Sequence, residues 1–186
     1  MLIDGRIDLA LLSELSRSRL IVSSRLAEEE MVLVTRPGTR AAGIVTAAEL
    51  RRTNLILGDG LRAAMDALLA GLGIELKVEL ELNDHETIRL MVQQGVGASI
   101  LPHASVAGEC ARGLVAAHRL TGTGIFRMLA LGTAANRSSS VARDVVAQTV
   151  TKLVGDYARE GRLVSTPLPR SGRGFRSAHA APLYRR

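Results

Sequence analysis

The 186-residue sequence contains no tryptophan, two phenylalanines and two tyrosines. A core must therefore be built from leucine, valine, isoleucine and alanine side chains. Proteins that bind single-stranded nucleic acid stack bases on aromatic rings, and this chain has almost no rings to offer for that function. Because 47% of its residues are hydrophobic, we expect a globular protein made of one domain or two small lobes.

Cysteine is almost as scarce, since Cys110 is the only one. A single thiol excludes an internal disulfide and a zinc site made of thiolates, and it suits a reducing cytoplasm. No apolar run approaches the ~20 residues that a membrane span needs. Asp4 follows the first three residues at once, so the chain start does not show the apolar region of a signal peptide. We therefore expect a cytoplasmic protein with no membrane partner.

Acidic residues are missing from the last part of the chain, and this accounts for the net charge of +6. From Ser165 onward there are five arginines and no aspartate or glutamate. The preceding residues, Met1–Val164, carry 19 basic and 18 acidic side chains and are close to neutral. The mixture of proline, glycine, serine and arginine at 165–186 predicts a disordered basic tail, not a phosphate-binding surface on the folded part.

The most informative stretch is Glu81–Pro102, which predicts a strand, a helix and a second strand. Asn83, with Glu86 three residues later, has the pattern of a helix cap. Gly95 is suited to end this helix, because glycine adopts the left-handed conformation without steric cost. The short apolar run before Pro102 is typical of a buried strand. A strand–helix–strand crossover of this kind implies a parallel sheet.

Strand and helix signals alternate along the rest of the chain. Polar residues at Ser13–Ser24 predict a surface connection. Strands are predicted at Ile7–Leu12, Met31–Thr35, Asn54–Leu57, Leu76–Leu82, Val115–Leu120 and Phe126–Leu131. Helices are predicted at Thr46–Leu50, between Gly60 and Gly73, and at Ser138–Arg159, with an irregular or helical connection at His103–Arg112. In the last helix the inward face is predicted to be Val141, Val145, Val146, Val150, Leu153 and Val154.

Gly58, Asp59 and Gly60 form a turn between a predicted strand and a predicted helix. The turn has neither the lysine and Ser/Thr of a P-loop nor the glycine spacing of a dinucleotide-binding loop. Two interpretations stay open. It is either a turn that lets a strand enter a helix, or a ligand contact that uses the free amides of the helix start.

The polar residues at the start of the next helix allow two interpretations as well. Asn83, Asp84 and Glu86 could form an acid–base cluster, but we interpret them as the cap of the helix. Asn83 could also contact a ligand from this position. His85, on the same helix start, is predicted to be a solvated residue.

The remaining histidines and the cysteine do not predict a metal or catalytic site. His103 and Cys110 are seven residues apart with no third ligand type nearby. Cys110 has no neighbouring base and is interpreted as an inert thiol. His118 is predicted to lie on a strand and to face solvent. No serine lies in a nucleophile elbow, so we predict no cofactor, no metal and no enzymatic activity.

The segment MVQQGVGASILP, preceded by ELND, resembles the effector-binding domain of LysR-type transcriptional regulators. Three further stretches fit this family in the right order: Asp4–Ala10, Leu26–Val34 and Asn54–Leu69. The resemblance implies an α/β fold of the two-lobed, type 2 periplasmic-binding-protein kind. It also implies that a small-molecule effector closes the lobes and that the change is relayed to a DNA-binding domain.

On this resemblance, lobe one is expected to comprise residues 1–46 and 106–164, and lobe two residues 47–105. Lobe one is expected to be incomplete, because the family's helix-turn-helix, linker helix and first sensor-domain elements have no counterpart in these residues. DNA is therefore expected to be a partner only through a missing N-terminal domain. The resemblance implies a dimer or tetramer only for the intact regulator.

The resemblance places the effector between the lobes. The predicted ligand-binding residues are Leu11, Leu12, Ser13, Gly58, Asp59, Gly60, Asn83, Asp84 and Pro102. Because Asp59 and Asp84 would repel a second anion, we expect a neutral or cationic effector, or one with hydroxyl or amide groups, and not a simple dicarboxylate. The alternatives are a solute-binding protein or an enzyme on the same fold, or a regulator remnant without function.

Overall fold

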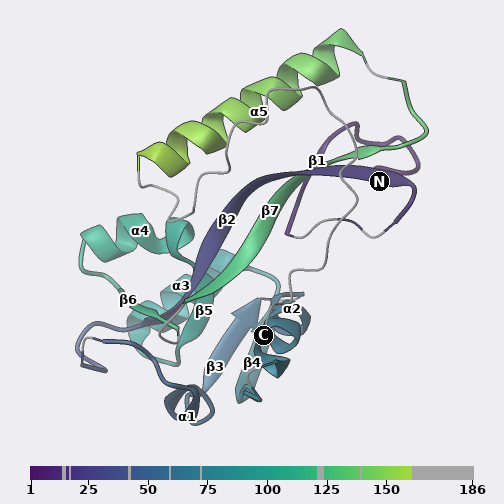
Figure 1. Cartoon of the computed structure of the whole chain (residues 1–186). Helices are drawn as coiled ribbons and strands as arrows, with labels where there is room; N and C mark the ends of the chain where they lie inside the picture. The colour runs from purple at the N-terminus through teal and green to yellow at the C-terminus, as the bar shows by residue number, and fades with distance from the viewer. Residues whose placement is uncertain are drawn as a thin grey trace. The chain divides into compact units, whose positions relative to one another are not determined.

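The computed structural model of the chain describes residues 1–13, 16, 18–41, 43–58, 60–71, 73–120, 124–138 and 140–160 (Figure 1). The predicted tail at 165–186 lies outside the described residues. In chain order the elements are β1 (Ala10–Leu12), β2 (Ile21–Thr35), α1 (Ala47–Leu50), β3 (Leu55–Gly58), α2 (Leu61–Ala70), β4 (Val78–Leu82), α3 (His85–Gln94), β5 (Ser99–Pro102), α4 (His103–Ala111), β6 (Ala116–Arg119), β7 (Ile125–Ala134) and α5 (Val141–Arg159).

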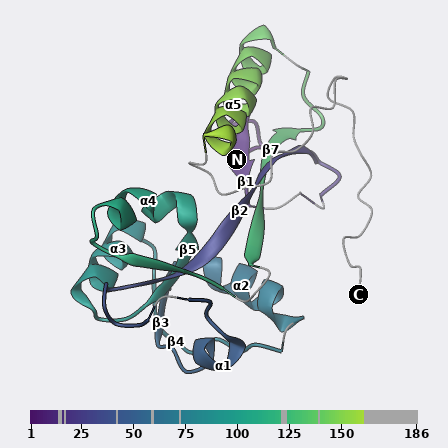
Figure 2. The same cartoon turned by 60° about the vertical axis from the view of Figure 1, so that its left-hand side comes forward.

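The chain divides into two compact units. One comprises Met1–Glu28 and the chain from Arg127 onward, and the other comprises Glu29–Phe126. Both division points lie inside the long strands β2 and β7, which run side by side (Figures 1 and 2). They differ from the positions at which the sequence predicts the lobe boundaries, so the assignment of residues to lobes stays a prediction.

In the unit Glu29–Phe126, the end of β2 forms the centre of a small antiparallel sheet. It pairs with β5, in the register Met31↔Pro102 to Val34↔Ser99, and with β6, from Val32↔Arg119 to Thr35↔Ala116. Along this part of β2, the odd-numbered apolar residues lie in one hydrophobic cluster and the even-numbered ones lie in another. The strand is therefore buried on both faces, which explains its nearly continuous apolar sequence.

The predicted parallel crossover is present in this unit. β3 pairs with β4 in parallel, and a parallel bridge joins Leu55 to Ala98, the residue before β5. Here the amide of Ile56 donates to the carbonyl of Ala98 at 2.8 Å. Helix α3 therefore connects two strands that run in the same direction on either side of β3. Because β5 also pairs antiparallel with β2, the complete arrangement is mixed.

Two hydrophobic clusters hold the elements of this unit together. The larger one joins β2, β3, α2 and β5 through Leu57, Met65 and Ile100, each 0% exposed. The smaller one packs α3 and α4 on the opposite face of β2, with Val92 and Val106 at 0% exposure. Burial of aliphatic side chains on both faces is the main stabilising contribution in a chain that has so few aromatic rings.

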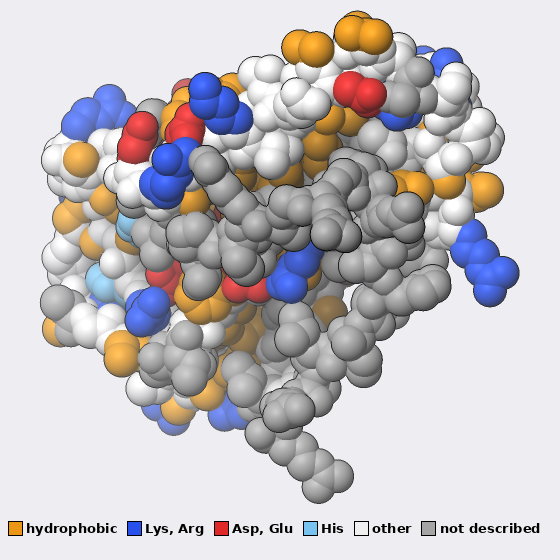
Figure 3. Space-filling view, turned by 45° about the horizontal axis from the view of Figure 1, so that its top comes forward, with side chains coloured by type: hydrophobic (Ala, Val, Ile, Leu, Met, Phe, Trp, Pro, Cys, Tyr) orange, Lys and Arg blue, Asp and Glu red, His pale blue; other side chains and the backbone are white. Residues whose placement is uncertain are grey.

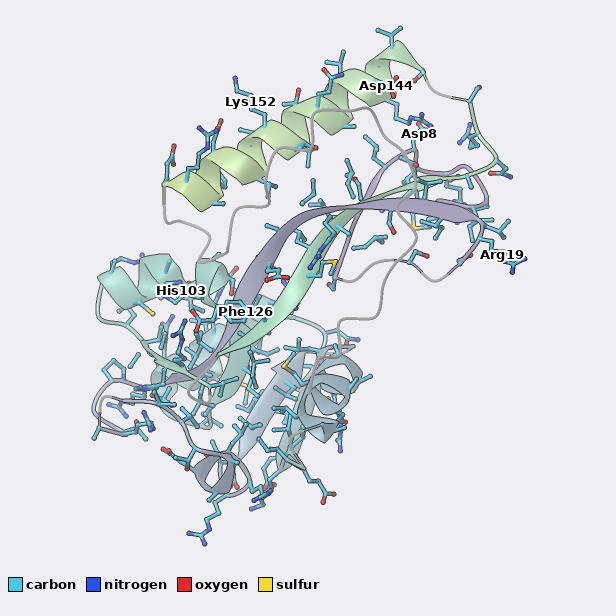
Figure 4. All side chains as sticks on the ribbon, in the orientation of Figure 1. Asp8, Arg19, His103, Phe126, Asp144 and Lys152 are labelled. Atoms are coloured by element: carbon cyan, nitrogen blue, oxygen red, sulfur yellow. The ribbon has the colours of Figure 1, made fainter. Side chains whose placement is uncertain are left out.

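In the other unit, β1 pairs antiparallel with β7, in the register Ala10↔Gly132 to Leu12↔Ala130. The carboxylate of Asp8, labelled in Figure 4, accepts a hydrogen bond from Nη1 of Arg137 at 3.1 Å. The same nitrogen donates to the carbonyl of Gly5 at 3.0 Å. This guanidinium ties the start of the chain to the connection after β7. The predicted surface connection at Ser13–Ser24 is wrong in its last part, because β2 already begins at Ile21 and neighbours β7 in the sheet.

The prediction of an inward apolar face on the last helix is also wrong. Helix α5 has the expected extent, but none of its residues is buried. Val141 is 84% exposed, and Val145, Val146 and Leu153 are between 48% and 56% exposed. Apolar spacing predicts which face of a helix should be covered, but it does not supply the element that covers it. Figure 3 shows hydrophobic side chains among charges of both signs on the molecular surface.

Candidate functional site

Three strand-to-helix junctions make up the candidate site, and all of them belong to the unit Glu29–Phe126. β3 leads into α2, β4 into α3, and β5 into α4. Since these strands run in parallel, their carboxyl ends lie at the same edge, the place where open α/β sheets bind ligands. The predicted site residues found at this edge are Gly58, Gly60, Asn83, Asp84 and Pro102.

The other predicted residues lie elsewhere. Leu11 and Leu12 are in β1 of the other unit, and Ser13 follows them. Leu12 packs against β7, where its Cδ1 lies 2.7 Å from the position that a Cβ on Gly132 would take. Asp59 lies outside the described residues. A ligand contact by any of these four residues stays a prediction.

The turn between β3 and α2 leaves the start of α2 without a side-chain cap. Gly58 is the buried last residue of β3, and Gly60 stands at the cap position of α2 with φ +75°. That left-handed conformation is one that glycine adopts at little cost. Among the described residues, which do not include Asp59, no side chain accepts a hydrogen bond from the first amides of α2. These amides are available to an acceptor group of a ligand.

The start of α3 is capped, but by Asp84 and not by the predicted Asn83. The Asp84 carboxylate accepts hydrogen bonds from the amides of Glu86 at 3.3 Å and Thr87 at 3.0 Å, and from the Thr87 hydroxyl. The hydroxyl first, and then the two amides, hold the pKa of the Asp84 carboxyl below its ordinary value. Asparagine and aspartate cap helices equally well, so their adjacent positions left the sequence ambiguous.

This correction predicts different effects for two neighbouring substitutions. Asp84→Ala should lower the thermal midpoint of unfolding at neutral pH, whereas Asn83→Ala should leave it nearly unchanged. Because the folded-state pKa of Asp84 is depressed, its contribution is present above the ordinary value of 3.8 and is lost as the pH falls through the folded value. Thermal melts of both variants at neutral and acidic pH test this. Equal destabilisation by the two substitutions would show that Asp84 is not the cap.

The junction between β5 and α4 is uncapped, like that of α2. Pro102 ends β5 and precedes α4, and no side chain of the described residues caps the first amides of this helix. The Ser105 hydroxyl turns back and donates to the carbonyl of Pro102 at 2.8 Å. His103, labelled in Figure 4, has a buried Nδ1 atom with no hydrogen-bond partner among the described residues. Two of the three helix starts at the edge are therefore uncapped by any side chain in the part of the chain that the structure describes.

Side chains of α3 bring the three junctions together. The ring of His85 lies against the turn after β3, where a Cβ on Gly58 would be only 3.0 Å from its Cε1 atom. Arg89, one turn further along, approaches Glu109 of α4 at 3.4 Å and the carbonyl of Ser105 at 3.4 Å. His85 is exposed, as predicted, but its contact with Gly58 has no signal in the sequence.

The remaining candidate residues differ in environment. His118 is only 7% exposed, so the prediction that it faces solvent is wrong. Burial first, and then the charge of Glu109, raises the pKa of the Cys110 thiol, which favours its unreactive neutral form. Within the described ranges, no group of three or more histidine, cysteine or acidic side chains is placed to hold a metal ion. No helix among these residues is long and apolar enough to cross a membrane.

Comparison with known proteins agrees with this architecture. The profile of the LysR substrate binding domain matches residues 1–154. The chain belongs to this family. A probable RuBisCO transcriptional regulator of Cyanophora paradoxa is 31% identical over 160 residues, which cover 79% of this chain and 49% of that protein. The chain therefore spans about half the length of the curated relatives that it matches.

Solved structures of the LysR family show the same fold. The effector binding domain of QuiR, in complex with shikimate, superposes with a TM-score of 0.70 and 21% identity, covering 84% of this chain and 76% of QuiR. The regulatory domain of CcmR from Synechocystis PCC6803, in complex with 2-PG, gives a TM-score of 0.69 and 20% identity, with 82% and 76% covered. The fold is therefore the α/β, periplasmic-binding-protein-like fold of LysR regulatory domains.

Proposed function

We propose that the chain senses a small-molecule effector for a LysR-type transcriptional regulator. The effector binds at the carboxyl ends of β3, β4 and β5. The observation that carries this proposal is the edge itself, where the starts of α2 and α4 are open while that of α3 is closed by its own Asp84. Homologous domains of this family bind small molecules, such as the shikimate bound to QuiR. Free amides at two helix starts supply hydrogen-bond donors for the acceptor groups of such a ligand.

The regulatory output follows from the family and not from these residues alone. We propose that effector binding is relayed to a helix-turn-helix domain that contacts DNA and lies outside this chain. Because the relatives are named as transcriptional regulators, we propose a regulatory role without catalysis. A cytoplasmic location fits a regulator of transcription. Assembly into a dimer or tetramer stays a prediction for the intact regulator.

The charge of Asp84 defines the preferred effector. Its carboxylate is engaged with the amides and hydroxyl of α3 and still adds a negative charge to the edge. An effector that is neutral, cationic or equipped with hydroxyl or amide groups avoids repulsion from this charge, whereas a dicarboxylate does not. The predicted contribution of Asp59 would act in the same direction.

Isothermal titration calorimetry tests this preference. A panel of polyhydroxylated and amide compounds and a panel of dicarboxylates are titrated into the chain, with Asp84→Asn as the diagnostic variant. Asparagine keeps a capping oxygen but removes the charge. The wild type should bind a member of the first panel, and Asp84→Asn should gain affinity only for dicarboxylates. Asp144→Asn on α5 (Figure 4) is the matched control and should change neither. Tight dicarboxylate binding by the wild type, unchanged in Asp84→Asn, would contradict the proposal.

A further inference from the structure

A network of polar side chains outside the candidate site joins three parts of the unit Glu29–Phe126. We define the Arg40 cluster as Thr35, Arg40, Glu49 and His118. Thr35 ends β2, Arg40 lies in the connection between β2 and α1, Glu49 is in α1, and His118 is in β6. Nothing in the sequence links these positions, because Arg40 and His118 are 78 residues apart.

The guanidinium of Arg40 is the centre of this cluster. It binds Glu49 in a bidentate pair, from Nε to Oε1 at 2.5 Å and from Nη2 to Oε2 at 2.9 Å. Nη1 also lies 3.0 Å from the carbonyls of both Ala41 and Gly43, and Nη2 lies 3.1 Å from the carbonyl of Ile44, all in the connection's own backbone. The Arg40 side chain therefore fixes the backbone of the connection between β2 and α1 and ties this connection to α1. The Arg40 side chain is only 16% exposed.

His118 occupies the other side of the guanidinium. Arg40 Nη1 lies 3.2 Å from His118 Nδ1, and His118 Nε2 lies 3.0 Å from the hydroxyl of Thr35. Nη1 has two hydrogens for three acceptors, so one hydrogen is shared between a carbonyl and Nδ1. Because arginine can only donate hydrogen bonds, Nδ1 acts as an acceptor in this contact and therefore carries no proton. The ring proton is then on Nε2, where it is donated to Thr35. The geometry allows only the neutral form of His118 to make both contacts.

A second proton on His118 would change the cluster. Nδ1 would become a donor that faces another donor, and two positive charges would meet at 3.2 Å inside a mostly buried site. Among the described residues, the charged groups that act on His118 are Arg40 and Glu49. The carboxylate of Glu49 opposes the repulsion, but it is already engaged by Arg40 in the bidentate pair. The repulsion that protonation causes would therefore be relieved if Arg40 left the cluster.

We propose that the Arg40 cluster is a proton-controlled latch, which holds the connection between β2 and α1 closed while His118 is neutral and releases it when His118 is protonated. Among the described residues, the freed ones are Arg36–Ala41, Gly43 and Ile44, because Val45 stays anchored by its buried side chain and by its amide, which donates to the backbone carbonyl of Arg119 at 2.9 Å. This device is independent of the effector site at the strand ends.

The direction of the pH response follows from the environment of the ring. Burial first, and then the charge of Arg40, lowers the pKa of His118 below its ordinary value of 6.5. The released form therefore binds the proton more readily than the latched form. The latch is fully closed above the ordinary value and opens as the pH falls through the lowered one. Between the ordinary and the lowered value each pH unit should increase opening by up to about tenfold, and below the lowered value the opening should level off.

Limited trypsin digestion of the chain measures this opening directly, because cleavage after Arg40 requires its side chain to leave the cluster. Cleavage after Arg52, an exposed residue in a turn, is the internal standard that cancels the pH dependence of the protease. The Arg40-to-Arg52 cleavage ratio should be low at about pH 8, should rise by up to about tenfold per pH unit as the pH falls from the ordinary pKa of His118 toward the lowered one, and should level off below it. In His118→Gln the ratio should not change with pH. The matched control His85→Gln should respond like the wild type.

Two results would overturn the proposal. One is a wild-type ratio that is constant down to about pH 5, below the usual range of histidine. The other is a pH response that His118→Gln retains. If His118→Gln does not fold, the ring of His118 can be titrated by NMR in the wild type. Its midpoint must then coincide with the midpoint of the cleavage ratio, and two separate midpoints would also refute the latch.

Discussion

Leu57→Ala is expected to lower the free energy of unfolding by about 2–5 kcal/mol. Leu57 is 0% exposed and lies in the larger hydrophobic cluster, one residue before the turn that opens α2. Removing its side chain leaves a cavity among aliphatic groups that can close only in part. Because β3 carries Gly58 at its end, the substitution should also loosen the edge at which we place the effector.

Leu90→Ala is the matched control. Leu90 is a leucine in helix α3 of the same unit, but 52% of its side chain is exposed. Its truncation should change the free energy of unfolding by no more than about 0.5 kcal/mol. Urea denaturation of both variants, followed by circular dichroism, provides the comparison. Similar losses in the two variants would show that β3 is not packed as described.

Gly97→Val should destabilise the chain by about 1–3 kcal/mol through overpacking. A Cβ at Gly97 would lie 3.0 Å from Cδ1 and 3.1 Å from Cγ1 of Ile56, and 3.5 Å from the carbonyl of Asn54. Ile56 is 3% exposed, so it has little room to move. The missing side chain thus allows the segment before β5 to approach β3 and to form the parallel bridge at Ala98.

Gly108→Ala is the control for this prediction. Gly108 lies within α4, and a Cβ there would meet nothing within 4 Å. Alanine is a better helix former than glycine, so this variant should gain about 0.5–1 kcal/mol. Denaturation curves that show no loss for Gly97→Val would mean that the strands are further apart than the structure places them.

The glycine pattern was the part of the sequence from which most could be predicted. Gly95 ends α3 with φ +78°, as its position predicted. Gly97 permits the close approach of two strands. The two glycines of the segment MVQQGVGASILP therefore differ in purpose, because Gly95 ends a helix and Gly97 allows strand packing. The helix predicted at Thr46–Leu50 is present, and Thr46 caps it by accepting from the amide of Glu49. These features are local, and local chemistry is visible in a sequence read residue by residue.

Features that depend on distant residues could not be predicted. The start of β2 at Ile21 requires β7, which lies about a hundred residues further along the chain. The burial of His118 depends on Arg40 and Thr35, and its alternating strand sequence alone favoured solvent. The exposed face of α5 shows a further limit, because its apolar spacing predicted an inward face that no described element covers.

The candidate site contains both kinds of feature, those that could be predicted from the sequence and those that depend on the fold. The resemblance to LysR regulators placed Gly58, Gly60, Asn83, Asp84 and Pro102 in one ligand site, and the structure puts all five at junctions that share one edge. Which helix starts are open could not be inferred, since the difference of one residue between Asn83 and Asp84 decides the cap. The contact between His85 and Gly58 also needed the fold.

The most direct test of the account is an NMR titration of the isotope-labelled chain with the panel of polyhydroxylated and amide compounds. We predict that at least one compound causes saturable shifts, concentrated at Gly58, Gly60 and the first amides of α4, while α5 stays unchanged. The capped start of α3 should respond less than the two open helix starts. Saturable shifts that avoid the strand ends, or no saturable shifts from any compound, would contradict effector binding at this edge.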